Sequence, residues 1–189
     1  LNIFIAAVAS CSPYLYSQIL KEKGWLLNTI SDKDFDISSL LEPLKSETYE
    51  NLYLKLRIAK RRAALWVALN DLADTWSLEE VTQNLSKFAE KAISLSWRAS
   101  FSKELRKGKF PKHYDSNPDK VGFFILAMGK LGAYELNYSS DVDLICFFDE
   151  EIFRPEDFQD VRRIFINATK NLYRILSEHG VDGYVFRTD

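Results

Sequence analysis

The sequence predicts an α+β protein, with a helical region at 1–110, a linker at 111–120 and an α/β core at 121–189. Two observations predict this division. Five of the seven glycines lie beyond residue 120, whereas 44–107 contains neither glycine nor proline. Apolar residues recur at helical spacing in the first part, and in the second they form short continuous runs typical of buried strands.

A capped helix is expected near the N-terminus. Ser12 suits the N-cap position, Pro13 suits the first helical position, and Gly24 is placed to end this helix. The apolar start at 1–9 follows no basic segment and is much shorter than the roughly 20 residues that span a bilayer. We therefore expect no membrane anchor. Because the chain starts with Leu rather than Met, and because Asp189 follows an apolar run without a turn, both chain ends are expected to be cuts within a longer protein.

Two long helices are expected to form an antiparallel hairpin. Apolar residues recur every three or four positions from about Glu47 to Ala73, which predicts the first. Ser77 and Glu80 match a capping box, and the same spacing follows to about Arg106, which predicts the second. Long helices joined by a short turn pack antiparallel. The polar, proline-containing stretch after them is the predicted linker.

The second part contains three apolar runs that suit strands, at 121–127, 142–148 and 183–189. A short helical turn is expected at 131–136, and a longer helix is expected after Pro155, where apolar residues again recur at helical spacing. This order predicts a small mixed sheet. Because Asp189 follows the last run without a turn, the core is expected to be incomplete at its C-terminal end.

The composition excludes several classes of protein. A formal net charge of -2 with 47% hydrophobic residues is not that of a disordered, collagen-like or polybasic chain. Cys11 and Cys146 lie in apolar surroundings without metal-ligand spacing, which predicts buried, reduced thiols in a cytoplasmic protein. The two histidines are isolated, so a zinc site is not expected.

A basic cluster on the first long helix raises the alternative of nucleic-acid binding. On a helical projection Arg57 and Arg61 lie opposite the apolar stripe, and the other members flank it. The cluster therefore surrounds the helix instead of forming one aimed stripe, and the chain is not basic overall. We expect a solvated surface or a protein contact and no nucleic acid. The cluster consists of Lys55, Arg57, Lys60, Arg61 and Arg62.

The residues suited to chemistry gather at 128–144, MGKLGAYELNYSSDVDL. Asp141 and Asp143 share one face if they lie on a strand, and two carboxylates so close repel unless Mg²⁺ or an arginine joins them. An Asp-x-Asp pair is also compatible with a solvated strand end. Gly129-Lys130 follows a strand and precedes a helical turn, where backbone amides would face an anion. Ser139-Ser140 adds hydroxyl groups beside the acid pair.

These motifs resemble the nucleotidyltransferase superfamily, in which a small residue pair after one strand holds phosphates and an Asp-x-Asp binds two metal ions. More narrowly, AMGKLGAYELNYSSDVDLI with GYVFRTD is similar to the glutamine synthetase adenylyltransferase family, also called glutamate-ammonia-ligase adenylyltransferase. These are bifunctional enzymes with two nucleotidyltransferase domains. The ELNYSSD stretch resembles the N-terminal, adenylyl-removing domain, and 54–93 is similar to the helices before it.

The resemblance implies a truncated nucleotidyltransferase core and the following roles. Catalysis and the binding of Mg²⁺, in two sites, are assigned to the carboxylates of Asp141, Asp143 and Asp189. The phosphate oxygens of ATP or ADP are assigned to Gly129, Lys130 and Ser139. Two residues are assigned either to the nucleotide or to bracing the acid pair, namely Ser140 and Arg187.

The implied reaction is attack of inorganic phosphate on the AMP phosphorus of adenylyl-tyrosyl glutamine synthetase, giving ADP and free tyrosine. The implied partners are glutamine synthetase, a PII-type signalling protein and the C-terminal half of the same enzyme. Since the chain stops at the third carboxylate, we expect this fragment to be inactive alone. Two alternatives stay open: a catalytically silent helical docking module, or a nucleotidyltransferase that acts on a different acceptor.

Overall fold

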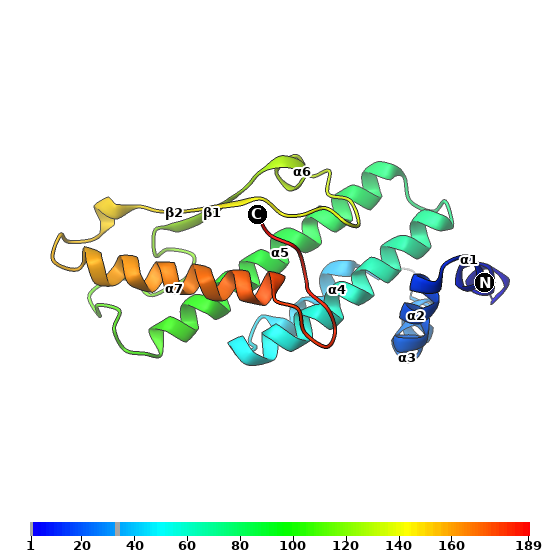
Figure 1. Ribbon diagram of the computed structural model, residues 1–189, viewed down its shortest axis with the longest axis horizontal. Coiled ribbons are helices and arrows are strands. Elements are labelled where there is room, and N and C mark those ends of the chain that lie inside the picture. Colours follow the sequence, from blue (N-terminus) through cyan, green and yellow to red (C-terminus); the bar gives the residue numbers. More distant parts are fainter. Residues whose placement is uncertain (1, 33–34) are drawn as a thin grey trace.

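Residues 2–32 form three short helices set against one end of the molecule, drawn in blue in Figure 1. The computed structural model describes residues 2–32 and 35–189, so Leu1 of the apolar start lies outside the described residues. In this described part, no helix has both the length and the apolar character needed to cross a bilayer. The predicted cap is confirmed, because Ser12 Oγ accepts a hydrogen bond from the Leu15 amide at 3.2 Å. The helices are α1 (Asn2–Cys11), α2 (Pro13–Lys21) and α3 (Lys23–Thr29).

Gly24 does not end the capped helix, as the sequence predicted, because it lies inside α3. The chain turns earlier, at Glu22, which follows α2 and precedes α3. The Glu22 side chain is only 4% exposed, and it accepts hydrogen bonds from Arg61 Nε at 2.7 Å and Arg62 Nε at 2.6 Å. Two arginines from a distant helix therefore fix the position of this turn.

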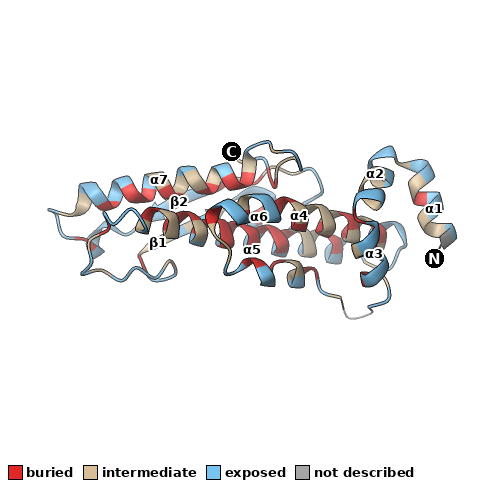
Figure 2. Ribbon diagram, turned by 90° about the horizontal axis from the view of Figure 1, so that it is seen from below, coloured by how far each residue is buried: buried red, intermediate tan, exposed pale blue. Residues whose placement is uncertain are grey.

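The two thiols lie in different environments. Cys146 is half-buried, and burial raises its pKa. Cys11 is exposed at the end of α1. The predicted burial of both thiols is therefore wrong for Cys11, which is exposed on α1, a helix at the outer end of the molecule (Figure 2).

The predicted helical hairpin is confirmed by α4 (Tyr49–Leu72) and α5 (Leu78–Leu105), which run antiparallel in Figure 1. Thr48 caps α4, with its hydroxyl accepting a hydrogen bond from the Asn51 amide. Ser77 and Glu80 form the predicted capping box, each accepting a hydrogen bond from the other's amide, at 3.2 Å and 2.8 Å. Two 3₁₀ turns, η1 (Ile37–Leu40) and η2 (Glu42–Leu44), precede the hairpin.

Removing the N-cap side chain of α5 tests how much the capping box contributes to the stability of the protein. Ser77→Ala is expected to lower the free energy of unfolding by about 1 kcal/mol, because the amide at Glu80 loses its acceptor. Urea unfolding of the two proteins measures the difference. Ser39→Ala is the control, since Ser39 lies in η1 and does not cap a helix. A loss at Ser77 no larger than at Ser39 would contradict the role of the cap.

Apart from the exposed Lys55, the basic cluster of α4 is turned into the molecule, which corrects the expectation of a solvated surface or protein contact for its other members. Arg57 is 2% exposed, although the helical projection placed it away from the apolar stripe. Its guanidinium donates to the carbonyl oxygens of Gly183, at 2.8 Å, and of Tyr53 and Glu178. The loop after the last helix crosses α4 at this point and buries the arginine.

The sheet has two antiparallel strands in the described residues, β1 (Phe123–Ala127) and β2 (Leu144–Phe148). The short helix α6 (Gly129–Gly132) follows β1. After β2 come a 3₁₀ turn, η3 (Glu150–Ile152), and the predicted long helix, α7 (Phe158–Ser177). The prediction of an α+β fold is confirmed. The boundary at 111–120 stays a prediction.

The predicted third strand at 183–189 is wrong over most of its length. The amides of Val185 and Phe186 both donate to the Leu176 carbonyl, at 2.9 Å and 3.0 Å, so this stretch is bonded to the end of α7. The segment then reaches the sheet only at its end, through an isolated parallel bridge between Val142 and Thr188 and a hydrogen bond from the Leu144 amide to the Asp189 carbonyl. The parallel part of the expected mixed sheet is therefore reduced to these two links.

Helices α5 and α7 cover one face of the sheet, and their buried stripes face one another in Figure 2. Trp97 of α5 stacks on Phe123 of β1, with ring centroids 3.7 Å apart, and the hydrophobic core runs from α4 through to the C-terminal segment. The other sheet face stays exposed in the described residues and is apolar, with a second stacked pair, Phe124 and Phe147, whose ring centroids lie 5.3 Å apart.

Candidate active site

The turn from β1 into α6 brings the main chain against a carboxylate. Gly129 has φ +56°, a left-handed conformation that favours glycine, and a Cβ built on it would lie 2.8 Å from Asp143 Oδ2. The Met128 amide donates to the Asp143 carbonyl at 2.9 Å. Gly129 and Asp143, fourteen positions apart in sequence, therefore lie in contact. Lys130 is exposed beside them.

Asp141 and Asp143 lie in the extended segment immediately before β2 instead of inside the strand. Val142 between them is fully buried, whereas both acids are half-buried, so the two carboxylates leave the same face as predicted. That face continues along β2 into exposed Ile145 and Phe147. The acid pair therefore adjoins the open, apolar side of the sheet.

An arginine pairs with one member of the acid pair, Asp141, so the joining of both acids by an arginine that the sequence allowed is present only in part. Arg187 Nε donates to Asp141 Oδ1 at 2.5 Å, and Arg187 Nη2 donates to the Ser139 carbonyl at 2.9 Å. The hydrogen bond to Asp141 and its negative charge raise the pKa of Arg187. The Ser140 hydroxyl donates to Asn137 Oδ1, so it is not directed at the acids.

Asp189, the residue with the third predicted carboxylate, lies beside the acid pair, and its main chain makes the contacts. The Asp189 amide donates to the Val142 carbonyl at 3.3 Å, and its carbonyl accepts from the Leu144 amide at 3.2 Å. Across residues 2–32 and 35–189, however, no three His, Cys, Asp or Glu side chains are grouped to hold a metal ion. The structure thus brings Gly129, Asp141 and Asp143 together without completing the triad.

The donor set fits magnesium in part. Carboxylate oxygens are the ligands that Mg²⁺ prefers, and Asp143 has no arginine on its carboxylate among the described contacts. At Asp141 the guanidinium of Arg187 takes the place that a cation would occupy. Full ligation of a metal ion at this site therefore requires Arg187 to release Asp141.

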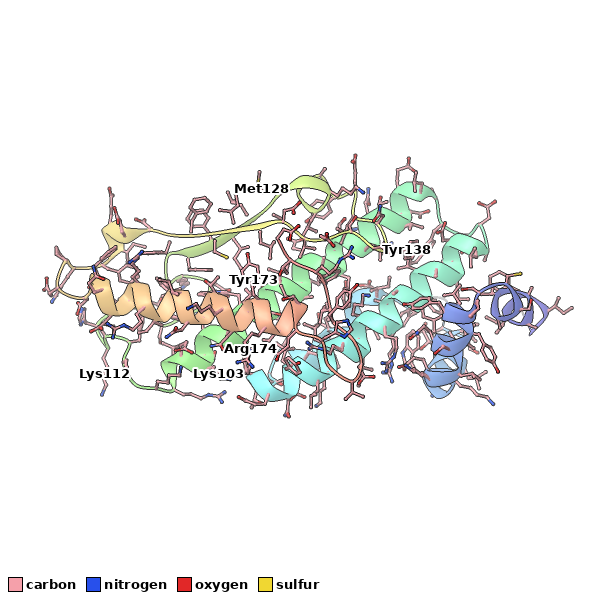
Figure 3. All side chains as sticks on the ribbon, viewed as in Figure 1. Lys103, Lys112, Met128, Tyr138, Tyr173 and Arg174 are labelled. Carbon is pink, nitrogen blue, oxygen red and sulfur yellow. The ribbon has the colours of Figure 1, made fainter. Side chains whose placement is uncertain are left out.

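A tyrosine that the sequence did not indicate positions the loop before the acids. Figure 3 labels Met128 just before α6 and Tyr138 on the loop after it. The Tyr138 hydroxyl donates to Asp71 Oδ2 of α4 at 2.9 Å, and burial together with this hydrogen bond raises the Tyr138 pKa strongly. The Leu136 amide similarly donates to Ser86 Oγ of α5 at 3.1 Å. These partners lie far away in sequence, so no local pattern announces them.

The comparisons with known proteins agree on one family. Residues 3–189 match the family described as glutamate-ammonia ligase adenylyltransferase. A protein of Agrobacterium fabrum is 36% identical over 100% of this chain, and one of Rhodopseudomonas palustris (strain HaA2) is 34% identical over 100%. A protein of Bradyrhizobium sp. is 33% identical over 98%. All three are described as bifunctional glutamine synthetase adenylyltransferase/adenylyl-removing enzymes.

These relatives are adenylyltransferases, and the chain belongs to the glutamate-ammonia ligase adenylyltransferase family. The resemblance inferred from the acid-pair motif is thereby confirmed. The chain spans 20% of the length of each of these relatives.

Gly129 offers a test of the contact with Asp143. Gly129→Ala is expected to lower the free energy of unfolding by about 1–3 kcal/mol, because the left-handed backbone is strained and the new Cβ meets the carboxylate. Gly108→Ala is the matched control: Gly108 has φ +70° but open space around its Cβ position. Chemical denaturation of both variants separates strain from contact. Equal losses would show that the contact with Asp143 carries no energy.

Proposed function

We propose that this chain carries part of the adenylyl-removing site of a bifunctional enzyme that regulates glutamine synthetase. The observation that carries the proposal is the contact of the Asp143 carboxylate with Gly129, beside Asp141 and the main chain of Asp189. Main-chain amides, a lysine and paired carboxylates at one strand end suit the transfer of a phosphoryl group. The membership of the chain in an adenylyltransferase family supports the same conclusion.

In the proposed reaction an oxygen of inorganic phosphate forms a bond to the AMP phosphorus of an adenylylated tyrosine. The bond from that phosphorus to the tyrosine oxygen breaks, so the products are ADP and the tyrosine hydroxyl, which takes up a proton. Asp141 and Asp143, with Asp189 as third ligand, would hold Mg²⁺ ions that neutralise charge at the reacting phosphorus.

The chain's other residues bind and orient the substrates in this proposal. Gly129, Lys130 and Ser139 contact phosphate oxygens, and Ser140 supports the loop that carries Asp141. Arg187 moves from Asp141 to a phosphate oxygen as the nucleotide binds, because a guanidinium pairs well with either anion. In this proposal the site is completed by further polypeptide of the longer enzyme.

The proposal extends to partners that the relatives' descriptions suggest or the family resemblance implies. The substrate is adenylylated glutamine synthetase, and the reaction takes place in the cytoplasm. A PII-type signalling protein and the C-terminal half of the enzyme, which adds AMP from ATP, control the direction. The alternative of a silent helical docking module is less favoured, because the arginines of α4 are bound within the molecule. The other alternative, a nucleotidyltransferase that acts on a different acceptor, is tested by the use of adenylylated glutamine synthetase as substrate in the experiment below.

Metal dependence and product identity test the proposed function. The full-length enzyme that contains this chain is incubated with adenylylated glutamine synthetase and inorganic phosphate, and nucleotides are separated by chromatography. We expect ADP in the presence of Mg²⁺ and none after chelation, with recovery when Mg²⁺ is restored. Pyrophosphate in place of phosphate is expected to give ATP only from the adenylylating half. ADP formation that persists in the chelator would contradict the metal-dependent site.

A further inference from the structure

A cavity of about 490 Å³ lies next to the acid pair but separate from it. Helices α2 and α4 enclose it together with the loop at 138–140 and the C-terminal segment at 184–187. Ser139, Ser140 and Arg187 line its edge, whereas Asp141 and Asp143 do not contribute to it. Its volume lies within the roughly 300–1,000 Å³ typical of small-molecule sites.

The floor of the cavity is one face of α4. Lys60, Ala64, Ala68 and Asp71 line it at helical spacing. Lys60 and Asp71 are separated by about 16 Å along the helix axis, and their side chains leave the same face. The two alanines between them leave room that larger side chains would fill. The cavity therefore has a cation at one end, a carboxylate at the other and apolar surface between.

Among the basic residues of α4, Lys60 has no hydrogen bond or ion pair within the described residues. The other basic residues of this helix, described above, are bound to carboxylates or carbonyl oxygens. Lys60 has neither partner in residues 2–32 and 35–189, and its Nζ lies 5.8 Å from the ring centroid of Tyr184. Burial lowers the pKa of Lys60. An ammonium group held this way gains a favourable partner when an anion enters the cavity.

The Asp71 end of the cavity and the aromatic residues that line it are suited to a flat ligand that carries a hydrogen-bond donor. Asp71 accepts the Tyr138 hydroxyl through Oδ2, so within the described part of the chain Oδ1 is open to a ligand. Aromatic residues from two segments line the cavity, namely Tyr14 of α2 and Tyr184 and Phe186 of the C-terminal segment. Aromatic side chains of this kind stack on planar rings.

We propose that this cavity is a second nucleotide site, independent of metal, that binds a purine mononucleotide carrying an exocyclic amino group, such as AMP. The phosphate lies at Lys60, the purine ring lies over Ala64 and Ala68 beside the aromatic residues, and its amino group donates to Asp71. The site neither uses the acid pair nor depends on the reaction proposed for it. Because Arg187 borders both, the ligand contacts the segment that holds Asp141.

Equilibrium binding of AMP to the 189-residue chain in the presence of EDTA tests this site. We expect saturable, one-to-one binding measured by calorimetry. Inosine monophosphate, whose ring carbonyl replaces the amino group, is expected to bind about tenfold or more weakly, because that carbonyl faces Asp71. Inorganic phosphate alone is expected to bind more weakly than AMP. Absence of AMP binding, or equal affinity for inosine monophosphate or phosphate, would overturn the proposal.

Four variants locate the ligand. Lys60→Gln is expected to weaken AMP binding about tenfold or more, and Lys55→Gln, an exposed lysine of the same helix paired with Glu47, is expected to leave it unchanged. Ala64→Leu is expected to fill the cavity and abolish binding, with circular dichroism reporting the fold. Asp143→Asn is expected to retain AMP binding. Loss of binding with Asp143→Asn, or equal effects of the two lysine variants, would overturn the assignment.

Discussion

Asp143→Asn in the full-length enzyme is expected to lower the rate of ADP formation from adenylylated glutamine synthetase by about a thousandfold or more. The substitution keeps the size of the side chain and its contact with Gly129 but removes the charge that a metal ligand needs. Loss of electrostatic stabilisation at a reacting phosphorus costs several kcal/mol in the transition state. Initial rates at saturating phosphate, measured by ADP release, give the effect.

The controls separate chemistry from folding and from the other half of the enzyme. Asp160→Asn on α7, where the carboxylate is 64% exposed and pairs with Arg163 across one helical turn, is expected to leave the rate unchanged. Pyrophosphate release from ATP and unmodified glutamine synthetase is expected to persist in Asp143→Asn. If ADP formation is unchanged by Asp143→Asn, the site assignment fails. If both reactions disappear and the melting temperature falls, the residue is structural.

Arg57→Ala is expected to give the largest loss of stability, about 3–5 kcal/mol in the free energy of unfolding. The guanidinium is 2% exposed and donates to three carbonyl oxygens, two of them in the loop between α7 and the C-terminal segment. Truncation leaves the carbonyls of Glu178 and Gly183 without their donor and opens a cavity against Tyr53. Urea denaturation followed by circular dichroism measures the loss.

Two further variants make this prediction specific. Arg57→Lys keeps the charge but cannot reach three carbonyl oxygens at once, so we expect an intermediate loss. Arg163→Ala removes an arginine that is 67% exposed on α7, and a change within about 0.5 kcal/mol is expected. A loss below about 1 kcal/mol for Arg57→Ala would mean that the loop is held by its own hydrogen bonds instead of by the arginine.

Local patterns predicted the elements whose causes are local. The capping box at Ser77, the cap at Ser12 and the apolar spacing of the hairpin depend on residues within one or two turns, and all are present in the structure. The first two strands depend on short apolar runs and are also present. The predictions that are wrong concern residues whose placement is decided by segments far away in the sequence. Gly24 lies inside α3 instead of ending the capped helix, because Arg61 and Arg62 hold the turn at Glu22.

The sequence by itself determined the α+β class, the family and the identity of the acid pair, because spacing along one strand direction places Asp141 and Asp143 on one face. Only the tertiary structure decided that Arg187 balances the charge of Asp141 and how far the Asp189 segment joins the sheet. It also decided that the basic residues of α4 other than Lys55 turn inward, leaving Lys60 over a cavity. Charge compensation is set by contacts between segments far apart in sequence, which local patterns do not encode.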